Sequence, residues 1–264
     1  MKYSHQYLVR VQYLGFRYSG WQKQPQSKTI EGMLEKTLKF ILDGSRFKIV
    51  GAGRTDAKVS ALHAAFELFI TDDSIELNSG FIELFNKNLP ADIRVTDMMK
   101  VPKDFNIIKD AEQKTYCYLF SFGSKNHPFA AATMTNFIDN LDIDTMTKAC
   151  HYFLGTHDFS NFTVRKGQET KNCVRTIDHC SLQLNTEYTA SFYPKKSYLL
   201  EVKAKGFLRY QVRLIIGALY QIGTGELTLD ELQSIINQTT KFRLTYVAPG
   251  SGLFLKDLHF NVPY

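Results

Sequence analysis

Hydrophobic and polar residues alternate in some segments of the chain and repeat at helical spacing in others. Residues 7–13 alternate as in a half-buried strand, and apolar positions in residues 30–42 recur as on one helix face that Gly44 ends. Residues 47–52, 64–70 and 93–101 are expected strands, and residues 81–89 an expected helix. This order predicts a first lobe, residues 1–105, with helices packed on a mixed sheet.

The rest of the chain predicts a second lobe, residues 106–264. Residues 114–123 alternate with aromatic side chains on one face, and residues 176–184 and 197–203 are expected to pair as strands. Three helices are expected: residues 146–154 ending at Gly155, residues 209–222, and one opened by a Thr-x-x-Glu capping box at Thr228. We therefore expect an α+β fold of two lobes, with a cleft between them.

Composition indicates an ordinary globular protein. Of 264 residues, 44% are hydrophobic and 22% charged, and no apolar run approaches the ~20 residues that cross a bilayer. The polar N-terminus lacks the features of a signal peptide, so we expect a cytoplasmic protein without a membrane span. The cysteines are irregularly spaced, which predicts reduced thiols, and the Cys173, His179 and Cys180 group does not have zinc-site spacing.

The net charge of +6 suits an anionic partner, and the positions of the basic residues along the sequence strengthen that interpretation. They are interleaved with aromatic residues, as in Tyr13, Phe16, Arg17, Tyr18, Trp21 and Lys23, and again in Lys109, Lys114, Tyr116 and Tyr118. Cations that neutralise phosphates beside rings that stack on bases are typical of a nucleic-acid groove. An aromatic core edge with solvated lysines is the alternative.

Two short segments could carry chemistry. In Gly53-Arg54-Thr55-Asp56 a turn places a carboxylate beside a guanidinium, although a surface ion pair would look the same. In the expected helix, Arg209 and Arg213 are four residues apart, and Arg213 lies near the apolar boundary. A partly buried guanidinium needs an anion, whereas two solvated arginines would not.

Six segments, in order along the chain, resemble the TruA family of tRNA pseudouridine synthases. They are YLGFRYSGWQKQPQSKTIEGMLE, GRTDAKVSALHAAFELF, FNIIKDAEQKTYCYLF, LGTHDFSNFT, GFLRYQVRLIIGALYQIG and APGSGLFLKDL. The resemblance implies the pseudouridine synthase fold, with the catalytic cleft between its lobes. It also implies that uridine is isomerised to pseudouridine in the anticodon stem-loop of tRNA, at nucleotides 38 to 40, by a homodimer without metal, redox cofactor or nucleotide.

The resemblance also assigns roles to residues. Asp56 is the expected catalytic carboxylate, either a nucleophile at C1′ or a base at C2′, and Arg213 keeps it ionised. Tyr116, Leu253 and Arg54 are the expected substrate-binding residues, with Tyr116 stacking on the uracil and Leu253 lining its pocket. The candidate phosphate contacts are chosen by charge and position alone: Arg17, Lys23, Lys109, Lys114, Arg165 and Lys166.

Several positions depart from the family pattern. Lys58 and Ser60 replace a usual glycine and histidine after the aspartate, and Leu14 replaces an aspartate. Ile108 stands for a common arginine, and Tyr210-Gln211 for a His/Met-type pair. These departures leave open a paralogue that modifies another tRNA or rRNA uridine, and an RNA-binding protein without activity.

Overall fold

The computed structural model describes residues 3–71, 79–164, 172–238, 244 and 246–261. Contacts within the chain group it into two compact units, Met1–Glu112 with Phe254–Tyr264, and Gln113–Leu253. The division into domains at residue 105 stays a prediction. Mixed sheets and packed helices confirm the α+β class.

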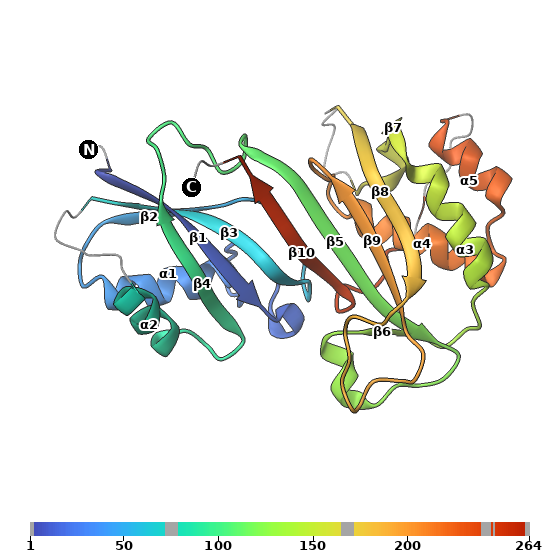
Figure 1. Ribbon diagram of the computed structural model, residues 1–264, viewed down its shortest axis with the longest axis horizontal. Coiled ribbons are helices and arrows are strands. Elements are labelled where there is room, and N and C mark those ends of the chain that lie inside the picture. Colours follow the sequence, from blue (N-terminus) through green and yellow to red (C-terminus); the bar gives the residue numbers. More distant parts are fainter. Residues whose placement is uncertain (1–2, 72–78, 165–171, 239–243, 245, 262–264) are drawn as a thin grey trace. The chain divides into compact units, whose positions relative to one another are not determined.

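The first unit is built on a mixed sheet. Its strands are β1 (His5–Tyr13), β2 (Phe47–Gly51), β3 (Ser60–Ile70), β4 (Ile93–Lys100) and β10 (Leu253–Phe260) (Figure 1). One edge of β1 pairs antiparallel with β3 and the other with β4. Strand β3 also pairs antiparallel with β2, while its first residues, Ser60 and Ala61, pair in parallel with β10.

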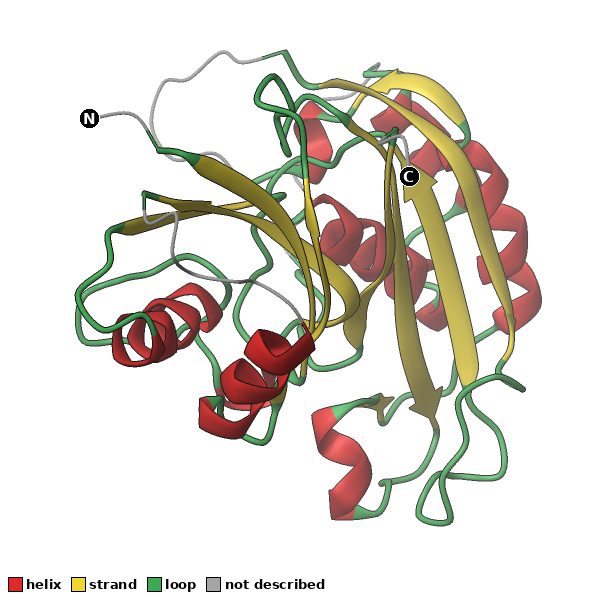
Figure 2. Ribbon diagram, turned by 60° about the vertical axis from the view of Figure 1, so that its left-hand side comes forward, coloured by secondary structure: helices red, strands yellow, loops and turns green. Residues whose placement is uncertain are grey.

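Two helices of the first unit, α1 (Ile30–Ile41) and α2 (Ser79–Asn88), lie side by side against its sheet (Figures 1 and 2). Helix α1 begins where predicted because the Thr29 hydroxyl accepts a hydrogen bond from the N–H of Gly32, as an N-cap does. Its buried stripe includes Ile30, Leu34 and Leu38, the apolar positions that predicted it.

The second unit contains an antiparallel sheet in the order β5-β9-β8-β7. Its strands are β5 (Ala111–Phe122), β6 (Thr135–Phe137), β7 (Gly155–Asp158), β8 (Val174–Leu184) and β9 (Tyr198–Ala204). The predicted pairing of β8 with β9 is confirmed, and β6 adds a short parallel pairing to β5. The helices are α3 (Ile143–Cys150), α4 (Gln211–Thr224) and α5 (Leu229–Ile236), and the capping box at Thr228 is present.

Two helix predictions were wrong at an end. Helix α3 stops at Cys150, and a 3-10 turn, η3 (His151–Phe153), follows it instead of helix as far as Gly155. This tighter turn buries Phe153, whose ring lies 5.4 Å from that of Phe162. Helix α4 begins at Gln211 rather than Arg209, because Tyr210 adopts a left-handed conformation with φ 63°.

A buried carboxylate joins β1 and β3 to the segment that follows β4. Glu67 on β3 is 3% exposed and accepts hydrogen bonds from the Gln6 side chain and, at 3.3 Å, from the N–H of Ile107. Gln6 also donates to the carbonyl of Phe105 at 2.8 Å. Burial raises the pKa of Glu67, although both hydrogen bonds act to lower it.

This raised pKa makes the stability of the fold depend on pH. The folded chain keeps the Glu67 proton to higher pH than the unfolded chain does, so the contribution is complete below the unfolded pKa near 4.5. It is lost as the pH rises through the folded value. In melting curves from pH 4 to 8 (roughly the window around that pKa), the difference in Tm between Glu67→Gln and the parent should grow with pH and then level off. An exposed control, Glu83→Gln, should show no such trend, and a flat difference for Glu67→Gln would refute the assignment.

Candidate active site

Asp56 lies in the loop of residues 52–59, which joins β2 to β3 and is called the Asp56 loop below. Thr55 anchors it: its carbonyl accepts a hydrogen bond from the N–H of Trp21 at 3.0 Å, and its hydroxyl lies 2.9 Å from the Tyr13 hydroxyl. The carbonyl of Asp56 accepts from the N–H of Val59 at 3.2 Å. The backbone on both sides of Asp56 is therefore fixed, while Asp56 itself is partly exposed.

The segment that braces this loop is residues 14–21, which follow β1 and include the 3-10 turn η1 (Gly15–Arg17). A Cβ atom on Gly15 would lie 1.9 Å from the Val59 carbonyl oxygen, and one on Gly20 would lie 2.6 Å from that of Thr55. Gly20 also has a φ of +98°, which disfavours other residues. Only glycine lets the two backbones approach this closely.

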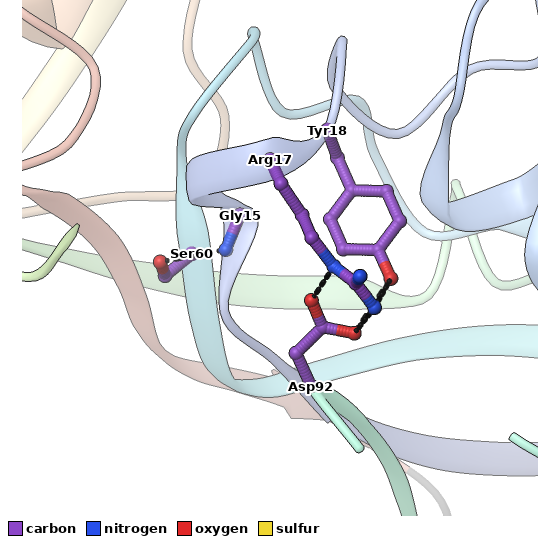
Figure 3. Close-up of polar contacts among 5 residues, drawn as sticks. All are labelled: Gly15, Arg17, Tyr18, Ser60 and Asp92. Atoms are coloured by element: carbon purple, nitrogen blue, oxygen red, sulfur yellow. Dashed lines mark hydrogen bonds and ion pairs between the residues drawn. The ribbon is translucent and has the colours of Figure 1, made fainter. Parts of the chain in front are cut away.

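The unusual residues after Asp56 belong to the same contact. Lys58 has a left-handed φ of 66°, and its N–H donates to the carbonyl of Tyr18 at 3.1 Å. The Ser60 hydroxyl accepts from the N–H of Gly15 at 2.9 Å; both residues are labelled in Figure 3. Leu14 donates its N–H to the carbonyl of Asp92 at 2.9 Å. Lys58 and Ser60 thus help join residues 14–21 to the Asp56 loop.

Arg17, a predicted phosphate contact, is paired with a carboxylate. Its guanidinium binds both oxygens of Asp92, to which the Tyr18 hydroxyl also donates at 2.7 Å (Figure 3). Burial and then the bond to Asp92 raise the pKa of Tyr18 to about 12. Burial acts to raise the pKa of Asp92, but the bonds from Arg17 and Tyr18 prevail and lower it. The charge of Arg17 is therefore largely balanced within the protein.

The other predicted phosphate contacts differ in their surroundings. Lys23 pairs with Glu35 at 2.5 Å, whereas Lys109 is exposed and forms no ion pair with the described residues. Arg54, a predicted substrate-binding residue, is likewise exposed and forms no ion pair with them. Lys114 lies on β5, where burial lowers its pKa. Arg165 and Lys166 lie outside the described residues.

Arg213, in the second unit, is half-buried on α4. Its Nε donates to the carbonyl of Ala248 at 2.6 Å, and its guanidinium carbon lies 5.1 Å from the centre of the Tyr210 ring. Arg209 lies at the same distance from that ring, but it is exposed and precedes the helix, so the predicted shared helix face was wrong. A carbonyl and an aromatic ring therefore orient Arg213.

The two expected uracil contacts also belong to the second unit. Tyr116 on β5 is partly exposed, and its ring packs edge-on against that of Phe207 at 5.3 Å. Its neighbour Tyr118 is fully buried; its hydroxyl donates to the carbonyl of Pro249 at 3.1 Å and lies 2.9 Å from the Thr135 hydroxyl. Leu253 is 4% exposed. Tyr116 and Leu253 thus provide a partly exposed ring and a buried aliphatic side chain.

Sequence reasoning missed two residues that orient others. The sequence pattern did not single out Asp92, and it marked Tyr210 only as a departure from a family pattern. The positive φ of Tyr210 has no signature in the sequence, because such conformations favour glycine, asparagine or aspartate. In the described part of the chain, no three His, Cys, Asp or Glu residues are grouped to hold a metal, and no helix could span a membrane.

The glycine at position 20 provides a test of the backbone contact. Gly20→Ala should lower the Tm and reduce kcat by about 10²-fold, since its Cβ displaces the Asp56 loop. Gly44→Ala is the matched control: Gly44 has a φ of +87° with nothing within 4 Å of the added Cβ, so it should cost only about 1–2 kcal/mol of backbone strain. Equal loss of Tm in the two variants, measured by thermal melting, would contradict the close contact.

The chain is similar in sequence to proteins of known family over nearly its whole length. Residues 149–261 match the family model described as tRNA pseudouridine synthase. The chain is 34% identical to the tRNA pseudouridine synthase A of Caldicellulosiruptor saccharolyticus, over 95% of this chain and 98% of that protein. It is 34% identical to that of Acetivibrio thermocellus, over 95% and 97%, and 31% identical to that of Streptococcus mutans, over 97% and 98%. The chain therefore belongs to the tRNA pseudouridine synthase A (TruA) family.

Proposed function

We propose that this protein isomerises uridine to pseudouridine in tRNA, at nucleotides 38 to 40 of the anticodon stem-loop, and works as a cytoplasmic homodimer. Two observations together support the proposal. Relatives named for this activity align with nearly the whole chain, and Asp56, the expected catalytic aspartate, is partly exposed on a loop whose backbone is held by hydrogen bonds. The protein's net charge of +6 also fits a polyanionic substrate such as tRNA.

The reaction exchanges one glycosidic bond for another. The bond from C1′ to N1 breaks, the uracil turns, C1′ bonds to C5, the C5 proton leaves and N1 gains a proton. Asp56 acts on the ribose, as a nucleophile at C1′ or as a base that removes a proton from C2′. Either role requires the ionised carboxylate, and the backbone bonds around Thr55 and Asp56 hold it in place.

Arg213 supplies the positive charge that keeps Asp56 ionised in this proposal. A cation within about 4–6 Å favours a carboxylate's charged form. The bond from Nε to Ala248 and the contact with Tyr210 restrict the guanidinium to one orientation, so less entropy is lost when it binds an anion.

Tyr116 and Leu253 would receive the extruded base. Flipping a uridine out of a stem-loop costs a few kcal/mol, which stacking on a ring such as Tyr116 offsets by about 1–3 kcal/mol. Leu253 would form a wall of the pocket. Arg54 and Lys109, whose charges are not balanced by the described carboxylates, are better placed to bind phosphates than Arg17 and Lys23 are.

A second candidate is a paralogue that acts on another tRNA or rRNA uridine. It is favoured by Lys58 and Ser60, because both lie next to Asp56 and differ from the family pattern. Tritium release measured on a panel of RNAs distinguishes this paralogue from an enzyme that acts on the anticodon stem-loop. The same measurement would identify a binding protein without activity.

The direct assay is tritium release from uracil C5. Unmodified tRNA carrying tritium at that atom should release it on incubation with the protein, and the product should map to nucleotides 38 to 40. Asp56→Asn should lower kcat by a factor on the order of 10⁴ or more, because it removes the reacting carboxylate. Asp97→Asn, an exposed aspartate of β4, is the control and should keep full activity. Release only from other RNAs would select the paralogue, and binding without release from any RNA would refute catalysis.

The same assay tests Arg213 against a matched arginine. Arg213→Lys keeps the charge but loses the Nε donor to Ala248, so kcat should fall about 10²-fold with little change in Tm. Arg209→Lys alters an arginine at the same distance from Tyr210 and should leave kcat within a few-fold of the parent. Full activity of Arg213→Lys would rule out a role for its fixed orientation.

A further inference from the structure

Lys58 combines three properties that the proposed reaction does not explain. It follows Asp56 by two residues, its backbone is left-handed with φ 66°, and its side chain is exposed. In the family pattern a glycine is usual here, which adopts this conformation without strain. A lysine at this position therefore carries a cost in backbone energy that a glycine would not.

The side chain of Lys58 lies against an exposed ring. Its ammonium nitrogen is 5.6 Å from the centre of the Phe16 ring, and Phe16 is 41% exposed at the first turn of residues 14–21. A cation over an aromatic face is attracted to it, so Phe16 restricts where the ammonium lies. Because the N–H of Lys58 is bonded to Tyr18, the backbone at Lys58 is fixed as well.

The charge of Lys58 is not balanced by a carboxylate of the described residues. Arg17 and Lys23, two cations that follow β1, bind Asp92 and Glu35, whereas Arg54, in the same loop as Lys58, forms no ion pair with a described carboxylate. No described acidic side chain forms an ion pair with Lys58. An oriented ammonium group with an unbalanced charge is suited to an anion from outside the protein.

The distance along the chain places that anion near the reacting ribose. Two residues of extended chain span at most about 7 Å, so Asp56 and Lys58 are close neighbours. A nucleotide that is flipped out rotates about its own backbone, and its flanking phosphates stay next to its ribose. A carboxylate that acts at the ribose therefore has a phosphate within reach of a lysine two residues away.

From this geometry we infer that Lys58, held over Phe16, binds the RNA backbone phosphate adjacent to the uridine on which Asp56 acts. The inference rests on the proposed function for the identity of the substrate. Lys58 is then a substrate contact that a glycine at this position cannot make. It strengthens the hold on the extruded nucleotide without taking part in bond breaking.

The test measures RNA binding in the Asp56→Asn background, so that turnover does not interfere. Lys58→Met should weaken binding of unmodified tRNA about five- to tenfold at about 0.1 M salt, and reduce the slope of log Kd against log salt by about 1. Lys58→Arg should restore both values. Lys39→Met, which removes an exposed lysine of α1, is the matched control and should change neither.

Lys58→Gly separates a binding role from a structural one. It relieves the left-handed strain, so its Tm should equal or exceed that of the parent, yet its Kd should rise as much as that of Lys58→Met. If Lys58→Met and Lys58→Gly bind as tightly as the parent with an unchanged salt slope, Lys58 is a solvated surface lysine and the inference fails.

The two proposals fail in different ways. If the otherwise unchanged protein releases tritium but Lys58 variants bind normally, the phosphate contact is wrong and the reaction stands. If no RNA releases tritium while Lys58→Met weakens binding and lowers the salt slope, the phosphate contact stands as an RNA-binding site and the reaction is wrong.

Discussion

The close approach of two backbone segments is the constraint on which the candidate site depends. Residues 14–21 lie so near the Asp56 loop that a single added Cβ on Gly15 or Gly20 would overlap a carbonyl oxygen. At this distance the segments exchange hydrogen bonds through Trp21 with Thr55, and through Ser60 with Gly15. The backbone around Asp56 is therefore positioned by close main-chain packing, and in the proposed reaction this packing preorganises the carboxylate.

Electrostatics divides the cations of the first unit into two groups. Arg17 and Lys23 are bound to carboxylates, and Arg17 with Asp92 and Tyr18 fixes the end of the 14–21 segment that follows η1 (Figure 3). Arg54 and Lys58 are exposed and form no ion pair with the described acidic residues. The excess of basic residues near the Asp56 loop is thus partly structural, and the proposed contacts with RNA fall to the cations whose charge no described carboxylate balances.

Local patterns predicted the elements that local interactions form. The apolar stripe of α1 and the capping box at Thr228 both lie within a few helical turns, and both were confirmed. The pairing of β8 with β9 followed from adjacent alternating segments. The sequence did not reveal the left-handed Tyr210, the early end of α3 or the partner of Arg17, because long-range contacts decide them; Asp92 is 75 residues from Arg17. At the site, the sequence motif around Asp56 indicated the catalytic candidate. The structural role of Ser60 became clear only from its hydrogen bond to Gly15.

The central claim is the proposed role of Asp56 as the carboxylate that acts at the ribose of a flipped uridine. A crystal structure of the Asp56→Asn protein with an unmodified anticodon stem-loop measures this directly. The account predicts a flipped uridine whose C1′ lies within about 4 Å of the residue 56 side chain, with the Arg213 guanidinium within about 4–6 Å of that side chain. A uridine bound against another carboxylate, or an Arg213 far from residue 56 in the complex, would contradict it.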